Sequence, residues 1–171
     1  MYSASDVALW FLSNNQNITN LKLQKLLYYA QGTFLAMTDS PLFQDDILKW
    51  RHGPVVPSVY EQYRSFGDRK ISNTTQPPQI ADIDIFLLNK VCELFGGHSA
   101  WQLSEMTHNE RPWMVTETNE TIENSIIKDY FKKNIFAPVL SDEIFDSIPI
   151  VEGKRDQDGV LVFPSEYDDE E

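Results

Sequence analysis

The sequence predicts a mainly α-helical protein with about six helices and little sheet. Three observations support this fold class. Apolar residues recur at three- and four-residue spacing in several segments, capping residues and glycines flank those segments, and β-type runs are short and few. With 171 residues and 42% hydrophobic content, the chain can bury one full core but is short for two. We therefore expect one all-α domain with a small extended element near residues 47–51.

The first two predicted helices follow from capping and spacing. Ser5 can cap a helix that ends near Asn14, and Thr19 or Asn20 opens a second helix that stops before Ser40-Pro41. The second helix carries one apolar stripe, so we expect it to be the central element of the core. The stripe consists of Leu23, Leu26, Leu27, Ala30 and Phe34, and the opposite side carries Lys22, Lys25, Tyr29 and Thr33.

Proline and glycine divide the middle of the chain. Residues 42–56 are too rich in proline, glycine and β-forming residues for a helix, so we expect an extended segment from Ile47 to Arg51. Pro57 suits the first position of a short third helix, which Gly67 ends. Residues 72–79 then form a predicted surface loop.

Three further helices complete the predicted domain. A fourth ends at Gly96-Gly97, and Ser99 with Gln102 has the spacing of a capping box that starts a fifth, which runs to about His108. A sixth is expected near residues 119–133. The predicted core residues are Leu87, Leu88, Val91, Cys92 and Phe95 in the fourth helix, and Ile122, Ile126, Ile127, Tyr130 and Phe131 in the sixth.

The end of the chain differs in charge and in pattern. Residues 1–134 hold 15 acidic and 12 basic side chains, whereas residues 135–171 hold 11 and 2, so the final segment carries −9 of the formal net charge of −12. Its β-type runs, 148–151 and 160–163, predict either a β-hairpin or an extended peptide that folds on a partner. We therefore divide the chain into a helical domain, 1–134, and an acidic extension, 135–171, which either meets a basic protein surface or acts as a solubilising terminus.

Composition excludes several functional classes. The acidic surface repels phosphate, so we expect no direct binding of nucleic acid. A single cysteine, Cys92, and the lack of a long apolar run predict a cytoplasmic protein without a disulfide or a membrane span. Cys92 lies on an apolar helix stripe and is expected to be a buried structural thiol. The three histidines lack metal-ligand spacing and no phosphate-binding glycine loop is present, so we expect neither metal nor cofactor.

The sharpest candidate chemistry lies at Trp50, Arg51 and His52, which precede the rigid Gly53-Pro54 pair. Core packing explains an apolar Trp50 but not the cation and the imidazole beside it. A lone histidine near apolar residues is more often a packed core group, and we favour that role for His52. A catalytic pair of His52 and His108 with Glu105 or Asp6 is the alternative, although no nucleophile or substrate-binding loop accompanies it.

A second candidate surface involves tyrosines. On the predicted exposed side of the second helix, Lys25 and Tyr29 can form a recognition surface with Tyr60 and Tyr63 of the third, because tyrosine offers large contact area with a polar end. The alternative is that these amphipathic rings fill the core or its boundary. The candidate partner-binding residues are thus Lys25, Tyr29, Trp50, Arg51, His52, Tyr60, Tyr63 and His108.

Three blocks of sequence resemble the Panacea antitoxin domain. They are LQKLLYYAQGTFL from Leu23 to Leu35, WRHGPVVPSVY from Trp50 to Tyr60, and LSEMTHNERPW from Leu103 to Trp113. The resemblance covers roughly residues 5 to 134 and does not extend to the acidic segment. One departure is Asp39, because the turn after the second helix commonly has glycine in this family; aspartate adopts the left-handed conformation less easily than glycine.

The resemblance implies a small, helical binding protein of bacteria or their phages that neutralises a toxin, rather than an enzyme. We expect an antitoxin that inhibits a cognate toxin protein by forming a stable complex and needs no cofactor. Two alternatives stay open, namely an enzyme that uses His52 and His108, and a regulatory adaptor that delivers a partner to proteolysis or to transcriptional machinery. No helix-turn-helix arm favours the transcriptional version.

Overall fold

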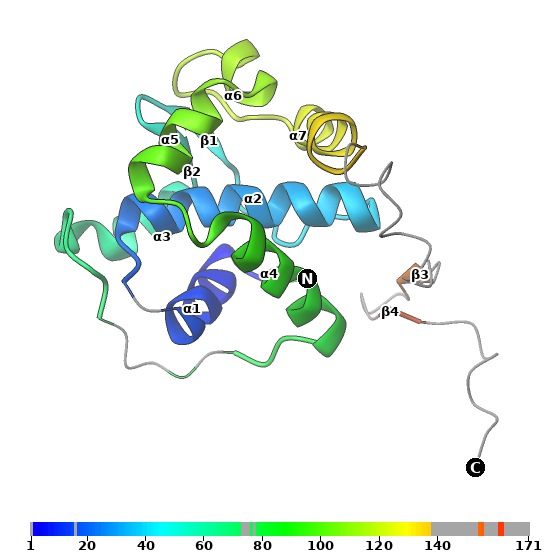
Figure 1. Ribbon diagram of the computed structural model, residues 1–171, viewed down its shortest axis with the longest axis horizontal. Coiled ribbons are helices and arrows are strands. Elements are labelled where there is room, and N and C mark those ends of the chain that lie inside the picture. Colours follow the sequence, from blue (N-terminus) through cyan, green and yellow to red (C-terminus); the bar gives the residue numbers. More distant parts are fainter. Residues whose placement is uncertain are drawn as a thin grey trace.

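The computed structural model describes residues 2–15, 17–72, 76 and 78–137, and the backbone of 154–155 and 161–162. Helix α2, Asn20–Thr38, crosses the middle of the helical domain (Figure 1). Helices α1 (Ala4–Asn14) and α4 (Asp82–Phe95) lie on one side of it, and α5 (Ala100–His108) lies on the other. The prediction of a mainly helical fold with a central second helix is confirmed.

The smaller elements surround this frame. They are the strands β1 (Leu48–Trp50) and β2 (Gly53–Val55), helix α3 (Pro57–Tyr63) with the 3-10 turn η1 (Arg64–Phe66), helix α6 (Arg111–Val115), helix α7 (Asn124–Tyr130) and the π-helix η2 (Phe131–Phe136). Helix α6 was not predicted, and the sixth predicted helix begins at Asn124 instead of near residue 119. Proline in the first turn of both α3 and α6 has no N–H, so it removes one of the amides that would lack a partner there.

Capping was predicted correctly at some helix ends and wrongly at one. Helix α1 is capped by Ser3, not by Ser5, and Ser3 forms a capping box with Asp6. The reason is that the Asp6 carboxylate stands three residues after Ser3 and can return the hydrogen bond to its amide. The capping box of Ser99 and Gln102 at the start of α5 is confirmed.

The core is built on both sides of α2. The whole predicted stripe of this helix is buried, and the residues opposite it are largely buried too, so α2 is enclosed nearly all round. In α4, Leu88, Val91 and Phe95 are buried, whereas Leu87 and Cys92 are partly buried against the core. A helix enclosed on all sides must satisfy its polar side chains internally.

Four polar side chains of α2, those of Asn20, Gln24, Lys25 and Gln31, do this by hydrogen bonding to the main chain of residues 42–60. The Gln31 amide oxygen accepts from the amides of Leu42 and Phe43, at 3.0 and 3.2 Å. The Gln24 amide oxygen accepts from the Val56 amide at 2.9 Å, and Asn20 donates to the Tyr60 carbonyl at 3.1 Å. These contacts fix an irregular segment on the helix surface.

Within that segment, β1 and β2 form an antiparallel hairpin in which Leu48 pairs with Val55 and Trp50 with Gly53. The extended segment predicted near 47–51 is therefore confirmed as one strand of the hairpin. On its other edge, the Lys49 amide donates to the Glu120 carbonyl and the Ile122 amide donates to the Ile47 carbonyl. The chain after α6 thus covers the outer edge of β1.

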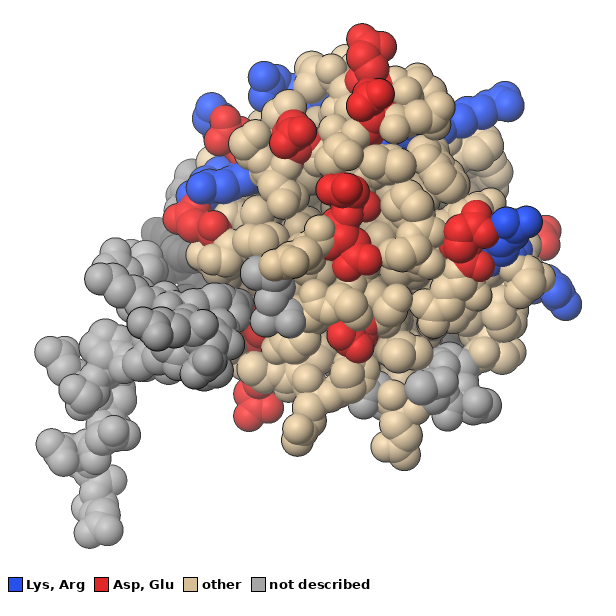
Figure 2. All heavy atoms as spheres, turned by 180° about the vertical axis from the view of Figure 1, so that it is seen from behind, with Lys and Arg blue, Asp and Glu red and all other residues tan. Residues whose placement is uncertain are grey.

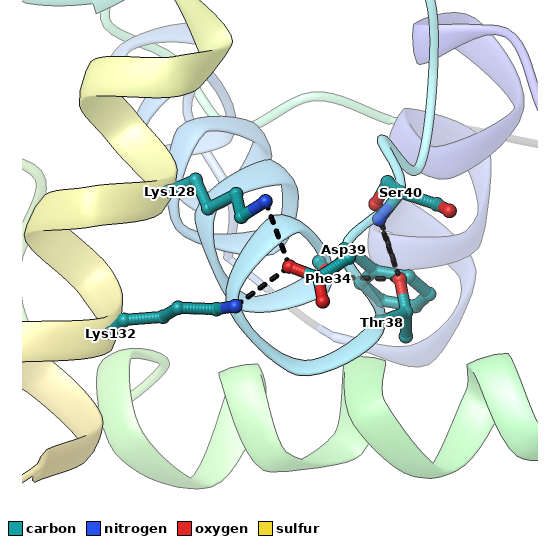
Figure 3. A network of polar contacts seen from close by, with 6 residues as sticks. All are labelled: Phe34, Thr38, Asp39, Ser40, Lys128 and Lys132. Carbon is teal, nitrogen blue, oxygen red and sulfur yellow. Dashed lines mark hydrogen bonds and ion pairs between the residues drawn. The ribbon is translucent and has the colours of Figure 1, made fainter. Parts of the chain in front are cut away.

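The C-terminal end of α2 is tied to α7 and η2. Asp39 ends α2 in the left-handed conformation at φ 56°, so the turn forms without glycine. Its carboxylate accepts from Lys128 at 2.8 Å and from Lys132 at 2.7 Å (Figure 3). These two hydrogen-bonded lysines lower the pKa of Asp39 to about 2. About two turns of α2 earlier, the ring of Phe131 occupies the space that a Cβ on Gly32 would need.

In the extension, Lys154–Arg155 (β3) pairs antiparallel with Leu161–Val162 (β4). The run 148–151, which we expected to supply one strand, lies outside the described residues. The division of the chain after residue 134 remains a prediction, but Ile135 and Phe136 pack against the core and belong with the helical part. Among the described residues, no helix is long and apolar enough to span a membrane.

We predict that Leu27→Ala will lower the free energy of unfolding by about 2 to 5 kcal/mol, because Leu27 is fully buried in the centre of α2. The matched control is Met37→Ala on the same helix, where the side chain is 41% exposed and the loss should stay below about 0.5 kcal/mol. Urea denaturation followed by circular dichroism measures both. Equal losses would show that the assigned faces of α2 are wrong.

Candidate protein-binding surface

The turn between β1 and β2 has a backbone that only glycine adopts easily. Gly53 has φ 105°, in the region that favours glycine. A Cβ at this position would lie 2.7 Å from the Lys25 Nζ and 2.8 Å from the Thr107 Oγ1. The turn therefore lies directly on α2 and α5, and glycine is needed both for its conformation and for its close approach.

Hydrogen bonds from three helices hold the turn by its carbonyl groups. The carbonyl of Trp50 accepts from the Trp113 indole at 3.1 Å, that of Arg51 from His108 Nε2 at 2.9 Å, and that of His52 from Ser104 Oγ at 2.8 Å. Below the turn, Lys25 Nζ donates to the Pro54 carbonyl at 2.9 Å. The main chain of residues 50–54 is thereby fixed, while its side chains take no part in these bonds.

Aromatic rings surround the turn. Trp50 packs edge-on against Tyr60, with ring centroids 5.0 Å apart, and His108 packs edge-on against Trp113 at 4.2 Å. Lys49 Nζ lies 4.3 Å from the Trp113 ring centroid and donates to the Thr116 carbonyl. The half-buried rings of Trp50, Tyr60 and Trp113 are therefore already in contact with neighbouring side chains. These contacts leave Arg51 and His52 exposed at the tip.

Five of the eight predicted binding residues lie together around this turn. The structure brings Trp50, Arg51, His52, Tyr60 and His108 together around the turn, as the sequence could not establish by itself. His52 is exposed, so the expectation that it is a packed core group is wrong. The reason is that the turn carbonyls, rather than the imidazole, face the interior.

Lys25, Tyr29 and Tyr63 are buried, so the predicted exposed surface on α2 is wrong. Lys25 is fully buried beneath the hairpin, and this burial lowers its pKa to about 7. Tyr63 packs into the core beside Phe66, with ring centroids 6.5 Å apart.

Tyr29 belongs to a buried cluster around Glu110. The Glu110 carboxylate accepts from the hydroxyls of Tyr28 and Tyr29, at 2.7 and 2.8 Å. Tyr29 also stacks on Phe95, with ring centroids 3.8 Å apart. Burial raises the pKa of Glu110 to about 7, although both hydroxyls stabilise its charged form. Glu110 precedes α6, so this cluster positions the helix that carries Trp113.

The geometry at the two histidines bears on the enzyme alternative. His108 Nε2 is bonded to a main-chain carbonyl, and the His52 ring contacts Trp101 edge-on, with centroids 5.8 Å apart. Of the carboxylates considered as their partners, Asp6 caps α1 and Glu105 lies exposed on α5. Within the described part of the chain, no group of three histidine, cysteine or acidic residues is placed to hold a metal ion.

Cys92 is half-buried rather than fully enclosed. Its Sγ accepts a hydrogen bond from Asn15 at 3.5 Å, and the side chain packs against the core. Burial raises the pKa of the Cys92 thiol, which keeps it in its unreactive protonated form. These contacts agree with a structural thiol.

Sequence reasoning missed Trp101, which is 67% exposed beside His52. Helical spacing could have indicated that Trp101 is exposed. Leu103 and Thr107 are fully buried on α5, and a residue two positions before Leu103 lies on the opposite side of a helix. A large aromatic residue on a polar helix face is typical of a contact surface.

Charge is unevenly distributed over the described surface. On the face seen in Figure 2, acidic side chains lie across the middle, and basic side chains lie nearer the edges. At the hairpin tip the local balance is different, because Arg51 and His52 stand exposed together. The tip therefore presents an exposed guanidinium beside aromatic residues on a protein with a formal net charge of −12.

We predict that Glu110→Gln will flatten the pH dependence of stability between about pH 4.5 and 7. Because the folded protein raises the pKa of Glu110 from 4.5 to about 7, the folded state holds this proton more tightly than the unfolded state. The wild-type protein should therefore lose stability as pH rises through this window, by up to roughly 3 kcal/mol. Above about pH 7 this penalty should be constant.

Urea denaturation at a series of pH values measures this effect. The exposed Glu105→Gln variant is the control and should follow the wild-type profile. A Glu110→Gln profile parallel to wild type would show that Glu110 is not buried as the structure places it.

Comparison with known proteins gives an independent identification. The family model described as "Antitoxin SocA-like, Panacea domain" matches residues 23–114, which include the hairpin, α5 and most of α6. A protein named Antitoxin SocA, from Caulobacter vibrioides (strain NA1000 / CB15N), is 32% identical over 137 residues, covering 67% of this chain and 72% of that protein. No solved structure matches significantly. The chain belongs to the Panacea domain family of SocA-like antitoxins.

Proposed function

We propose that this protein is an antitoxin that neutralises a cognate toxin protein by binding it directly, in the cytoplasm and without a cofactor. Membership of the SocA-like family supports the antitoxin role. Direct binding is supported by the hairpin tip, where four main-chain carbonyls are hydrogen-bonded and the side chains of Arg51 and His52 are exposed.

The fixed backbone of the tip is the observation that carries this proposal. A surface that is already ordered before binding loses little conformational entropy when the complex forms. The tip also combines arginine with aromatic residues, the types that dominate binding energy at protein interfaces. The partner-binding residues we propose are therefore Trp50, Arg51, His52, Tyr60 and His108. The buried Lys25, Tyr29 and Tyr63 stabilise the fold and do not contact the partner.

The acidic extension is proposed as a second, auxiliary contact. It carries −9 of the formal net charge, and opposite charge on a toxin surface would speed association. This contact needs a basic region on the toxin, separate from the region that meets the hairpin tip.

The test is co-expression with the product of the adjoining reading frame. We predict that the antitoxin restores growth and that both chains are purified together in stable proportion. Gel filtration and mass measurement of the eluted species establish the complex. His52→Ala and His108→Ala, checked for folding by circular dichroism, serve as diagnostic variants.

Rescue without a detectable complex, combined with its loss in a folded histidine variant, would support the enzyme alternative. Rescue that requires a cellular protease and depletes the toxin would support the adaptor alternative. Neither outcome is compatible with neutralisation by a stable complex alone.

We predict that removing residues 138–171 will slow association with the toxin and reduce its dependence on salt, because the electrostatic attraction is lost. Truncation after Ala137 keeps the whole of η2 and the packed Ile135 and Phe136. Stopped-flow association rates at low and high salt measure the effect. Identical rates and salt dependence would assign the extension to solubility only.

A further inference from the structure

We propose that Trp101, His52 and Arg51 form the anchor of the interface and that they receive an acidic segment of the toxin that also bears an apolar or aromatic side chain. This inference rests on the proposed function and specifies the chemistry of the partner. The anchor is composed of two exposed residues of the hairpin tip and one exposed residue of α5.

Exposure distinguishes Trp101 from the other apolar residues. At 67% it is the most exposed of the large apolar side chains in the described part of the chain. Exposed tryptophan has a free-energy cost in water, and burying it against a partner recovers a large apolar area. Its ring lies edge-on to His52, with centroids 5.8 Å apart, so Trp101 stands directly beside the hairpin tip.

The position of His52 depends in turn on α5. Ser104 Oγ holds the His52 carbonyl at 2.8 Å, and His108 holds the Arg51 carbonyl at 2.9 Å. Trp101, Ser104 and His108 follow one another on successive turns of the same helix face. The main chain of the three anchor residues is therefore held in one arrangement by α5 and by the turn that lies along it.

Charge identifies the partner segment as acidic. Among the described residues, no hydrogen bond or ion pair engages the guanidinium of Arg51, and the exposed His52 lies next to it. The nearby Lys49 is already used by Thr116 and Trp113. Arginine pairs with a carboxylate in two parallel hydrogen bonds, so a carboxylate of the toxin is the natural partner for the exposed guanidinium of Arg51. Glu105 is the one exposed acidic residue on this part of α5.

Nucleic acid is the less favoured occupant. Phosphates would also pair with Arg51, and bases would stack on Trp101. The net charge of −12 and the acidic face in Figure 2 oppose the approach of a polyanion, which needs many cationic contacts along its backbone. A single short acidic segment of a protein needs only the tip.

The α4 surface shows how a different exposed aromatic residue is arranged. Phe86 is 46% exposed, but Lys90 lies over its ring at 5.7 Å and pairs with Glu93. Its ring is thus partly covered by its own helix, and the cation that lies over it is already paired with Glu93. Phe86→Ala therefore removes an exposed aromatic residue without touching the anchor.

The experiment measures the affinity of the full-length protein for the product of the adjoining reading frame, by calorimetric titration. We expect Trp101→Ala to raise Kd roughly thirtyfold, as hot-spot residues do, and Arg51→Glu to raise it about tenfold or more. Phe86→Ala should stay within about twofold of wild type. Trp101→Phe should recover part of the affinity, and circular dichroism and urea denaturation confirm that each variant is folded.

The outcomes separate this inference from the proposed function. If the wild-type protein forms no complex, the proposed function and the anchor both fail. If the wild-type complex forms but the folded Trp101→Ala and Arg51→Glu variants bind as well as Phe86→Ala, only the anchor fails. If Glu105→Lys weakens binding while Arg51→Glu strengthens it, the partner segment is basic. If oligothymidylate binds saturably and Arg51→Glu abolishes that binding, the occupant is nucleic acid.

Discussion

The hydrogen bonds between the polar side chains of α2 and the main chain of residues 42–60 are the constraint on which the rest of the structure depends. Gln31, Gln24 and Asn20 each hold one part of that segment, and Lys25 holds the hairpin. Leaving any buried amide or carbonyl without a partner costs about 1 to 3 kcal/mol, so the segment has one favourable position on the helix. Side-chain hydrogen bonds thus fix the main chain of residues 42–60, although part of it is neither helix nor strand.

The fold was predictable where local pattern decides it. The apolar stripe of α2, the proline at the start of α3 and the capping box of α5 follow from spacing and side-chain chemistry alone. The position of α6 was missed because five residues carry too little periodicity to reveal a helix. Ser3, and not the predicted Ser5, caps α1, because the Asp6 carboxylate returns a hydrogen bond to the Ser3 amide.

The candidate site was predictable only in part, for a physical reason. Helical spacing indicates which residues share a side, but not that α2 is covered on both sides, and so Lys25 and Tyr29 were placed in solvent. Their burial depends on partners far along the chain, Pro54 and Glu110. The importance of Arg51 and His52 was visible from their unusual position beside Trp50, whereas Trp101 joins them only through the packing of α5.

The hydrogen bonds from α2, α5 and α6 to the hairpin tip all go to main-chain carbonyls, and this has a consequence for how the protein can change. None of the four bonds to the carbonyls of residues 50, 51, 52 and 54 uses the side chain of Arg51 or His52. Substitution at these two positions leaves every bond available, provided that Gly53 is kept. Mutation can therefore alter what the tip recognises without remodelling its shape, which separates the evolution of partner choice from the maintenance of the fold.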